Sequence, residues 1–235
     1  MARFRIMFIL HEYEDKESLI IQLACTITEK LRAALNKKNV VSIALAGGKT
    51  PQPLFEALSF SDIEWSRVVI LPTDERLVAE TDIRSNTGLI KRTLLKNLAT
   101  SGKVLSFAQN NETRTIFLRT LSEQIKSLMP IDICILGMGE DFHIASIFPD
   151  SDRLEEALNI QGKEVLLPIS SPTASEPRLT LTSYALKSVL NRHLLIIGEQ
   201  KRLALKEALN MKTEKEAPVR SILFDKITTN IHYAC

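Results

Sequence analysis

Short runs of β-branched apolar residues alternate with longer amphipathic segments along the chain, and this alternation constrains the fold more than any other feature. Within 16–35, for example, leucine or isoleucine recurs at every fourth position from Leu19 to Leu35. Such alternation predicts an α/β fold with a doubly wound, mostly parallel sheet that carries helices on both faces. The predicted strands span 4–10, 40–46, 68–72, 131–137, 165–169, 178–182 and 193–198. The predicted helices span 16–35, 52–58, 86–98, 113–128, 184–190 and 201–211.

The length of 235 residues is enough to bury one large core, and no internal repeat, low-complexity tract or long linker divides the chain. We therefore expect a single domain over 1–235. The polar stretch 170–177 is predicted to be a surface loop near the functional site. The formal net charge of +2 comes from 30 basic and 28 acidic residues, and no basic block is interleaved with aromatic residues. A nucleic-acid-binding surface is therefore not expected.

The three cysteines, Cys25, Cys134 and Cys235, lie far apart in the sequence. They form no Cys-x-x-Cys motif, which argues against a disulfide framework and against a structural zinc site. The apolar run 6–10 is too short for a signal peptide, and no stretch approaches the roughly 20 apolar residues that span a membrane. These features favour a protein of the reducing cytoplasm with no membrane partner.

Two glycines follow the strand predicted at 40–46 and begin the sequence Gly47-Gly48-Lys49-Thr50-Pro51. Glycines let backbone N–H groups approach an anion, and a proline suits the first turn of a helix whose N-terminus carries partial positive charge. The segment is therefore predicted to hold a phosphate. A nucleotide-binding P-loop is disfavoured because Ile43 stands where that motif needs its first glycine. A plain strand-to-helix turn remains the alternative.

The segment 137–149 combines glycines, acids, an imidazole and a hydroxyl directly after the strand predicted at 131–137. In open α/β proteins, loops of this kind place reactive groups at the carboxyl edge of the sheet. His143 is the natural general base and acid, because free imidazole titrates near pH 6.5, and Asp141 lies two residues before it. His193 and His232 are interpreted as packing or surface residues, and His11 as a strand-end residue with no functional role.

Charged residues also stand at the ends of other predicted elements. Asp74 and Arg76 follow the strand at 68–72, Arg178 begins the strand at 178–182, and Lys201 begins a helix. A cation at a helix N-terminus opposes the helix dipole, which makes sense if it shares an anion with that helix or with a neighbouring loop. Taken alone, each of these cations would be interpreted as a solvated surface charge.

Together these segments resemble the 6-phosphogluconolactonase family. The family patterns are Ser-Gly-Gly-Ser/Thr-Thr-Pro, Asp-Glu-Arg-x-Val followed by Ser-Asn, Gly-x-Gly-x-Asp-Gly-His-Thr-Ala-Ser-Leu-Phe-Pro, and Pro-Arg-x-Thr-Leu-Thr. Their counterparts lie, in family order, at 46–51, 74–78, 85–86, 137–149 and 177–182. The resemblance implies the fold shared by glucosamine-6-phosphate deaminase and ribose-5-phosphate isomerase. It also implies hydrolysis of 6-phospho-D-glucono-1,5-lactone to 6-phospho-D-gluconate in the oxidative pentose phosphate pathway.

The resemblance further implies a role for each matching residue. His143 would be the general base and acid, with Asp141 and Asp74 as further catalytic residues. The substrate and its phosphate would be held by Gly47, Gly48, Lys49, Thr50, Arg76, Arg178 and Lys201. An ion pair that braces a loop is the alternative for Asp74 and Arg76. No metal or organic cofactor is implied, the only partner is the small-molecule phosphosugar lactone, and the protein is expected to be a monomer or a homodimer.

Three positions depart from the family pattern. Phe142 replaces the glycine before the catalytic histidine, Ile144 replaces a threonine, and Lys49 replaces a small hydroxyl residue. If residue 142 needs a positive φ, an aromatic side chain there costs on the order of 1 kcal/mol or more and could displace His143. Two other functions therefore stay open: an amino-sugar-phosphate deaminase/isomerase, whose signature also carries His-Ile-Ala, and a catalytically weak phosphosugar-binding protein.

Overall fold

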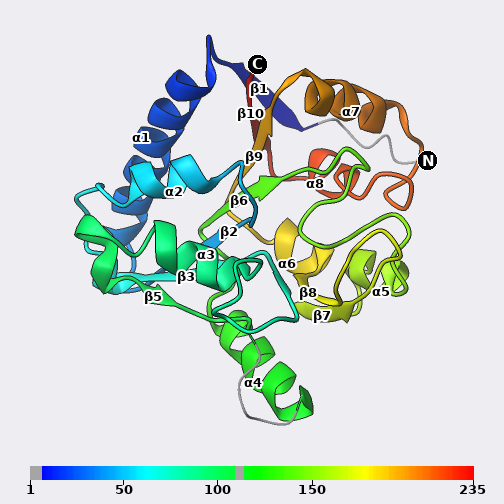
Figure 1. The fold of residues 1–235 in the computed structure, drawn as a ribbon, viewed down its shortest axis with the longest axis horizontal. Coiled ribbons are helices and arrows are strands. Elements are labelled where there is room, and N and C mark those ends of the chain that lie inside the picture. The colour runs from blue at the N-terminus through cyan, green and yellow to red at the C-terminus, as the bar shows by residue number, and fades with distance from the viewer. Residues whose placement is uncertain (1–6, 109–113) are drawn as a thin grey trace.

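The computed structural model describes residues 7–108 and 114–235, and Figure 1 shows their arrangement. The strands are β1 Phe8–Glu12, β2 Val41–Leu45, β3 Val68–Pro72, β4 Asp74–Arg76, β5 Lys103–Val104, β6 Ile133–Gly137, β7 Leu166–Ile169, β8 Arg178–Leu181, β9 Asn191–Ile197 and β10 Thr229–Ala234. The α-helices are α1 Lys16–Leu35, α2 Gln52–Leu58, α3 Asn86–Thr93, α4 Arg114–Ser127, α5 Leu154–Leu158, α6 Ser183–Lys187, α7 Glu199–Asn210 and α8 Arg220–Leu223. Short 3₁₀ helices span Trp65–Arg67 and Asn97–Ser101.

A seven-stranded sheet forms the centre of the fold, with the strand order β1-β10-β9-β6-β2-β3-β5. All of its neighbouring pairs are parallel, which confirms the predicted α/β architecture. Side chains from the two faces of the sheet enter two different apolar clusters. On β2, for example, Ile43 and Leu45 pack with α1 and α2, whereas Ala44 packs with the cluster that includes α4, α6, α7 and α8. In Figure 1, α1 and α2 lie to the left of the sheet and α7 and α8 to the right.

Helix α1 shows how the sequence pattern becomes a packed element. The Asp15 carboxylate accepts a hydrogen bond from the backbone N–H of Ser18 at 2.7 Å, so the helix begins with a side-chain cap. The predicted leucine and isoleucine stripe is buried along the whole helix. Because i and i+4 side chains share one face of a helix, the stripe covers the sheet with a continuous apolar surface.

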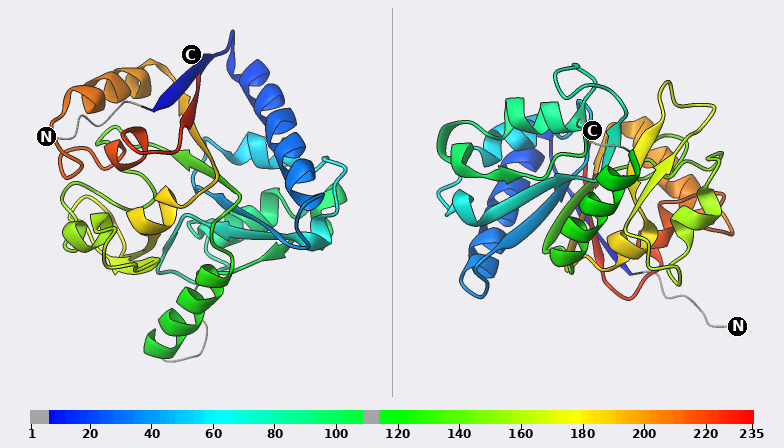
Figure 2. Two further views of the ribbon diagram at one scale, coloured as in Figure 1. Left: turned by 180° about the vertical axis from the view of Figure 1, so that it is seen from behind. Right: turned by 90° about the horizontal axis from the view of Figure 1, so that it is seen from below.

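A second, three-stranded antiparallel sheet has the order β4-β8-β7 (Figure 2). The strands predicted at 165–169 and 178–182 lie in this small sheet and not in the parallel one. Strand β4, which was not predicted, is a three-residue strand of charged residues. Its register places Arg76 opposite Arg178 and Asp74 opposite Thr180. Charged residues that are distant in the sequence therefore become neighbours.

Several predicted boundaries differ from the structure. The helix predicted at 86–98 ends at Thr93, because Lys96 is extended and Asn97 has a positive φ of 48°. Strand β10 was missed because its sequence carries threonine, asparagine and histidine, although most of these residues are buried in the fold. Residues 4–6 of the first predicted strand and residue 113 of the predicted helix 113–128 lie outside the described residues. Among the described residues, no helix is both long and apolar enough to span a membrane.

Four adjacent strands, β9, β6, β2 and β3, end at the same edge of the parallel sheet. After β2 the chain enters α2, which packs on one face, whereas the segment after β6 packs Ile144 and Ile147 on the other face. When the segments that follow two adjacent strands turn toward opposite faces of the sheet, a crevice opens between them at the carboxyl ends of the strands. The crevice is therefore placed by the strand order of the fold.

Candidate active site

A cavity of about 310 Å³ occupies this crevice. Eight of the predicted site residues line it: Gly47, Gly48, Thr50, Asp74, Arg76, His143, Arg178 and Lys201. They come from the ends of β2, β3, β6 and β9 and from the small sheet. The structure thus brings together most of the residues that the sequence motifs indicated.

Two predicted residues do not line the cavity. Asp141 lies behind His143 and contacts its ring. Lys49 is exposed and lines an adjoining groove, where Arg92 and Lys96 are also found. The cavity and this groove share Gly48, so Lys49 lies next to the crevice without facing into it.

His143 and Asp141 form a close pair. The Nδ1 atom of His143 lies 2.6 Å from the Oδ1 atom of Asp141. Burial alone would raise the pKa of Asp141, but the hydrogen bond from His143 and its charge lower that pKa below the ordinary value. An ionised Asp141 accepts a hydrogen bond from Nδ1–H, so Nε2 is left as the basic nitrogen of the ring. The ring also packs on Phe148, with the ring centroids 4.3 Å apart.

Gly139 leaves room for this pair. A Cβ atom at residue 139 would lie 2.2 Å from the Asp141 carboxylate and 2.3 Å from Nδ1 of His143. The backbone N–H of Gly139 donates to the His143 carbonyl at 3.0 Å, which closes the loop on itself. The glycine is needed because the histidine–carboxylate pair lies directly against the backbone.

Phe142 adopts a positive φ of 70°, in the left-handed region that favours glycine. Its backbone is nevertheless held at both ends: its N–H donates to Gly139 and its carbonyl accepts from Val219. Its ring packs against the larger apolar cluster. The aromatic residue is therefore accommodated, and His143 keeps its place in the cavity.

We expect Phe142→Gly to be more stable than Phe142→Ala by about 1 kcal/mol. Both substitutions remove the same ring contacts, but only alanine retains the strain of a positive φ. Urea unfolding of the two variants measures the difference directly. An alanine variant that is at least as stable as the glycine variant would show that the left-handed conformation costs nothing here.

Asp74 is held by hydroxyl groups beside the cavity. Its Oδ2 atom accepts a hydrogen bond from Ser146 Oγ at 2.6 Å, and its Oδ1 atom accepts from Thr73 Oγ1 at 3.1 Å. Arg178 lies 3.9 Å from the same Oδ2. Asp74 is almost fully buried, so these contacts compensate for the loss of water around its charge.

Glu75 was not predicted as a site residue, yet it supports the cavity from behind by binding the backbone of Arg76 and Asn86, which line it. It is fully buried, and its carboxylate accepts backbone hydrogen bonds from Arg76, Asn86 and Thr87 and one from the Ser85 hydroxyl. The carboxylate thereby satisfies free N–H groups at the start of α3. The signal available in the sequence was an acidic residue directly after Asp74. The sequence does not show that this acid is buried or where its hydrogen-bond partners lie.

Asn86 connects this support to the phosphate-binding segment. Its side chain donates to the Asp74 carbonyl at 2.8 Å. A Cβ atom at Gly47 would lie only 1.8 Å from the Asn86 Oδ1 atom. Gly48 next to it has a φ of 93°. Both glycines are therefore required, one by close packing and one by backbone conformation.

Cations give the cavity a local positive charge. Burial lowers the pKa of Arg178, and the Asp74 carboxylate partly opposes this shift. Burial also lowers the pKa of Lys201, with Glu140 opposing. The Arg76 guanidinium donates to the Arg84 carbonyl at 2.6 Å, while its Nε atom is buried without a hydrogen-bond partner among the described residues. Such partly desolvated cations favour an anionic ligand.

The predicted loop 170–177 does lie at the site. Thr173, Ala174 and Ser175 line the cavity, and the Ser171 hydroxyl anchors the loop by donating to Asp150 at 2.6 Å. Within residues 7–108 and 114–235, no group of His, Cys, Asp and Glu side chains is arranged to hold a metal ion. The cavity combines a general base with a separate anion-binding region, an arrangement suited to acid–base chemistry on a phosphorylated substrate.

Comparisons with known proteins find relatives in sequence and in structure. Residues 14–231 match the family model of glucosamine-6-phosphate isomerases/6-phosphogluconolactonase. A 6-phosphogluconolactonase of Pseudomonas putida is 33% identical over 218 residues, which cover 93% of this chain and 90% of the relative. The crystal structure of a 6-phosphogluconolactonase from Shewanella baltica OS155 is 30% identical and superposes with a TM-score of 0.92, covering 97% of this chain and 98% of that one. A monomeric glucosamine-6-phosphate deaminase shares the fold, with a TM-score of 0.76 at 16% identity over 95% of this chain and 96% of its own. The chain therefore belongs to the family of glucosamine-6-phosphate isomerases and 6-phosphogluconolactonases.

Proposed function

We propose that this protein hydrolyses 6-phospho-D-glucono-1,5-lactone to 6-phospho-D-gluconate. The observation that carries the proposal is one cavity that is lined by His143, which Asp141 contacts from behind, and by a separate set of anion-binding groups. Two similar proteins named as 6-phosphogluconolactonases support it, because the similarity extends over 90% and 98% of their own length. A cytoplasmic location is part of the proposal and is supported by all three cysteines being unpaired.

Lactone hydrolysis needs a base for the attacking water and a proton for the departing ring oxygen. In the proposed mechanism, Nε2 of His143 removes a proton from the water as its oxygen bonds to C1. The tetrahedral intermediate then collapses, the bond between C1 and the ring oxygen breaks, and the imidazolium returns the proton to that oxygen. Asp141 orients the ring and stabilises its charged form. Protons and electrons balance without a metal or organic cofactor.

The phosphate would anchor the far end of the substrate. We assign it to the backbone of Gly47 and Gly48, to Thr50, and to the side chains of Arg178 and Lys201. Each charge-assisted hydrogen bond contributes about 1.5–3 kcal/mol, and the anchor holds C1 next to the base. Lys49 is left out of this set because it lines the adjoining groove.

Asp74 and Arg76 are assigned to the sugar side of the cavity. Asp74 already accepts hydrogen bonds from two hydroxyl groups and lies within ion-pair distance of Arg178. Its role in the proposal is therefore to fix Arg178 and to accept a hydrogen bond from a sugar hydroxyl. Proton transfer is left to His143.

The direct test is hydrolysis of freshly generated 6-phosphogluconolactone, followed through 6-phosphogluconate dehydrogenase and corrected for spontaneous ring opening. We expect turnover well above the spontaneous rate. Release of ammonia from glucosamine 6-phosphate would instead identify a deaminase. Thermal stabilisation by phosphosugars without any turnover would identify a binding protein.

Arg178→Ala is expected to raise KM for the lactone about 10- to 100-fold while kcat changes much less. The predicted loss is that of one charge-assisted phosphate contact, made equally in the ground state and the transition state. Steady-state kinetics at constant ionic strength separate the two parameters. Arg32→Ala, on α1 and outside the cavity, is the matched control. An unchanged KM for Arg178→Ala would remove this residue from the phosphate site.

A further inference from the structure

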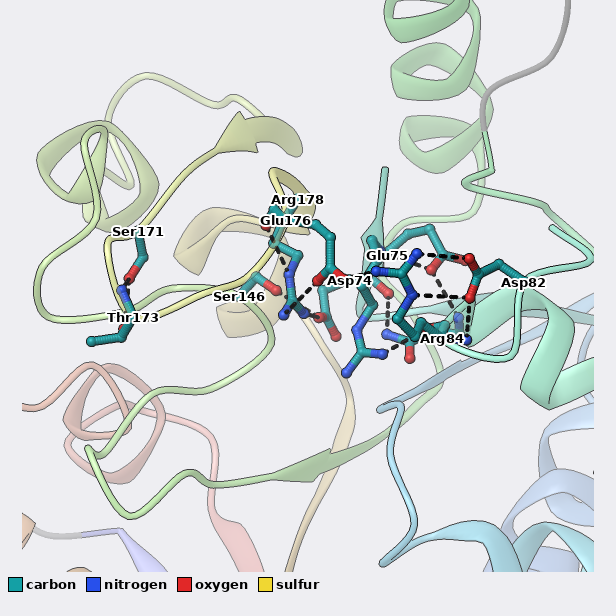
Figure 3. A network of polar contacts seen from close by, with 11 residues as sticks. Asp74, Glu75, Asp82, Arg84, Ser146, Ser171, Thr173, Glu176 and Arg178 are labelled. Atoms are coloured by element: carbon teal, nitrogen blue, oxygen red, sulfur yellow. Dashed lines mark hydrogen bonds and ion pairs between the residues drawn. The ribbon is translucent and has the colours of Figure 1, made fainter. Parts of the chain in front are cut away.

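Two loops meet beside the cavity through an ion pair. One follows β4 and carries Arg84, and the other joins β7 to β8 and carries Glu176. The Arg84 guanidinium contacts the Glu176 carboxylate through Nη1 (Figure 3). The Glu176 side chain is only 15% exposed, whereas that of Arg84 is 50% exposed. The pair therefore shields a largely buried carboxylate that lies close to the proposed phosphate site.

Arg84 is held in the orientation that this contact needs. Its Nε and Nη2 atoms bind the two oxygens of Asp82 at 3.0 and 2.8 Å, which leaves Nη1 for Glu176. A two-point contact of this kind fixes the plane of a guanidinium group. The third donor is thus directed across the gap between the loops.

Glu176 in turn lies against Arg178. Its backbone carbonyl accepts a hydrogen bond from Nε of Arg178 at 3.2 Å, while its Oε2 atom lies 3.8 Å from Nη2. The carboxylate is therefore close to Arg178 without a direct hydrogen bond to the guanidinium. A small movement of the Glu176 side chain would complete that bond, and the guanidinium would then be less available to an anion.

We propose that Arg84 is a positioning residue that withholds the Glu176 carboxylate from Arg178, so that Arg178 remains available to the phosphate of the substrate. This inference rests on the proposed function, because it takes Arg178 as a phosphate ligand. Without Arg84, the Glu176 carboxylate loses its closer cation, pairs with Arg178 and repels the phosphate. The effect on binding comes from the charge of Glu176 and not from the position of the loops.

A simple brace between the loops makes a different prediction. If the ion pair only ties the loops together, loss of either partner weakens binding, and loss of both is no better. If Arg84 withholds Glu176, loss of Arg84 alone weakens binding, and removal of the Glu176 charge as well restores it. The carbonyl of residue 84, which accepts from Arg76, remains in an Arg84→Gln variant.

The experiment measures binding of 6-phosphogluconate by calorimetry, together with KM and kcat for the lactone, in Arg84→Gln, Glu176→Gln and the double variant. We expect Arg84→Gln to weaken binding and raise KM by about 5- to 20-fold with kcat within about twofold. Glu176→Gln should bind no more weakly than the wild type, and the double variant should return to within about twofold of it. Lys91→Gln, which breaks an exposed ion pair with Glu80 near the same loop, is the matched control and should change nothing.

Wild-type affinity in Arg84→Gln, or a double variant as weak as Arg84→Gln, would overturn the inference and leave the lactonase proposal intact. A wild-type protein that binds no 6-phosphogluconate and does not hydrolyse the lactone would overturn both.

Discussion

Replacement of His143 by alanine is expected to lower kcat for lactone hydrolysis by about 10²- to 10⁴-fold, the usual contribution of a positioned general base. Binding of 6-phosphogluconate should stay within about threefold of wild type, because the anion-binding residues come from other strand ends. The side chain is partly exposed, so the free energy of unfolding should change little. Kinetics, calorimetry of product binding and urea unfolding test the three statements separately.

Asp141→Asn separates the base from the residue that orients it. An amide can donate to Nδ1 and stabilise the wrong tautomer, and it no longer stabilises the imidazolium, so we expect kcat to fall at least about tenfold with little change in KM. Asp152→Asn is the matched control, because the Asp152 carboxylate accepts a hydrogen bond from the backbone N–H of Ser170 and lies outside the cavity lining. A His143→Ala variant that retains a tenth or more of the wild-type kcat would contradict the assigned base.

Local sequence patterns predicted the parts of the fold that local forces determine. The stripe of α1 and the apolar runs of β2, β3, β6 and β9 were visible because their period or their burial is uniform. Strand β10 and the charged strand β4 were missed, because each is a strand only through its neighbours in a sheet. Tertiary pairing overrides weak local propensity at these positions.

The candidate site also combines residues that the sequence marks with residues that matter only through their contacts in the fold. The glycines, His143 and the terminal cations that line the cavity could be singled out because motif chemistry marks them in the sequence. Glu75 and Arg84 were not found, because their importance depends on which atoms they contact after folding. Lys49 shows a different limit: it belongs to the predicted phosphate motif by sequence, yet its side chain lines the adjoining groove. A motif predicts which residues lie near a site but not the direction of each side chain.

A second large effect is expected from acid, through a buried stack of histidines for which the sequence suggested no role in the site. His193 and His232 are 1% and 3% exposed. Nδ1 of His193 lies 2.9 Å from Nε2 of His232, whose Nδ1 lies 2.8 Å from the Tyr13 hydroxyl. The His11 ring stacks on His232 with centroids 5.0 Å apart. With both buried rings neutral, His232 can donate through one nitrogen and accept through the other, and Nδ1 of His193 completes its contact, so the chain of contacts needs no charge. Nε2 of His193 is buried without a hydrogen-bond partner among the described residues.

Protonation of either buried ring is unfavourable in the fold. Burial lowers the pKa of His193 to about 3, with smaller contributions from the neighbouring His232, Lys30 and His11. Burial likewise lowers the pKa of His232 to about 3, and His11 adds to this shift. In the unfolded chain both rings regain the ordinary value of about 6.5. Between these two pH values the unfolded state binds more protons, so the free energy of unfolding must fall as the pH is lowered.

A difference of one pKa unit between the folded and unfolded states corresponds to 1.36 kcal/mol. Protonation of one ring in the unfolded state therefore reduces the free energy of unfolding by about 2–3 kcal/mol at pH 4.5 relative to pH 7, and protonation of both rings by up to about twice that. A loss of this size is a large share of the stability of an ordinary domain. Urea unfolding between pH 7.5 and 4.5 should therefore show a free energy that declines once the pH falls below about 6.5.

The slope of this decline identifies its source. A His193→Gln/His232→Gln variant should be less stable at pH 7.5 but should lose most of the dependence on pH, because the extra protons taken up on unfolding are gone. Ile231→Val, at a buried position on β10, is the matched control: it should lower stability by about 1 kcal/mol at every pH and keep the wild-type slope. If the double glutamine variant kept the wild-type slope, the carboxylates would be the groups whose protonation destabilises the fold. The buried histidines would then be ordinary packing residues, one of the two roles that the sequence alone suggested.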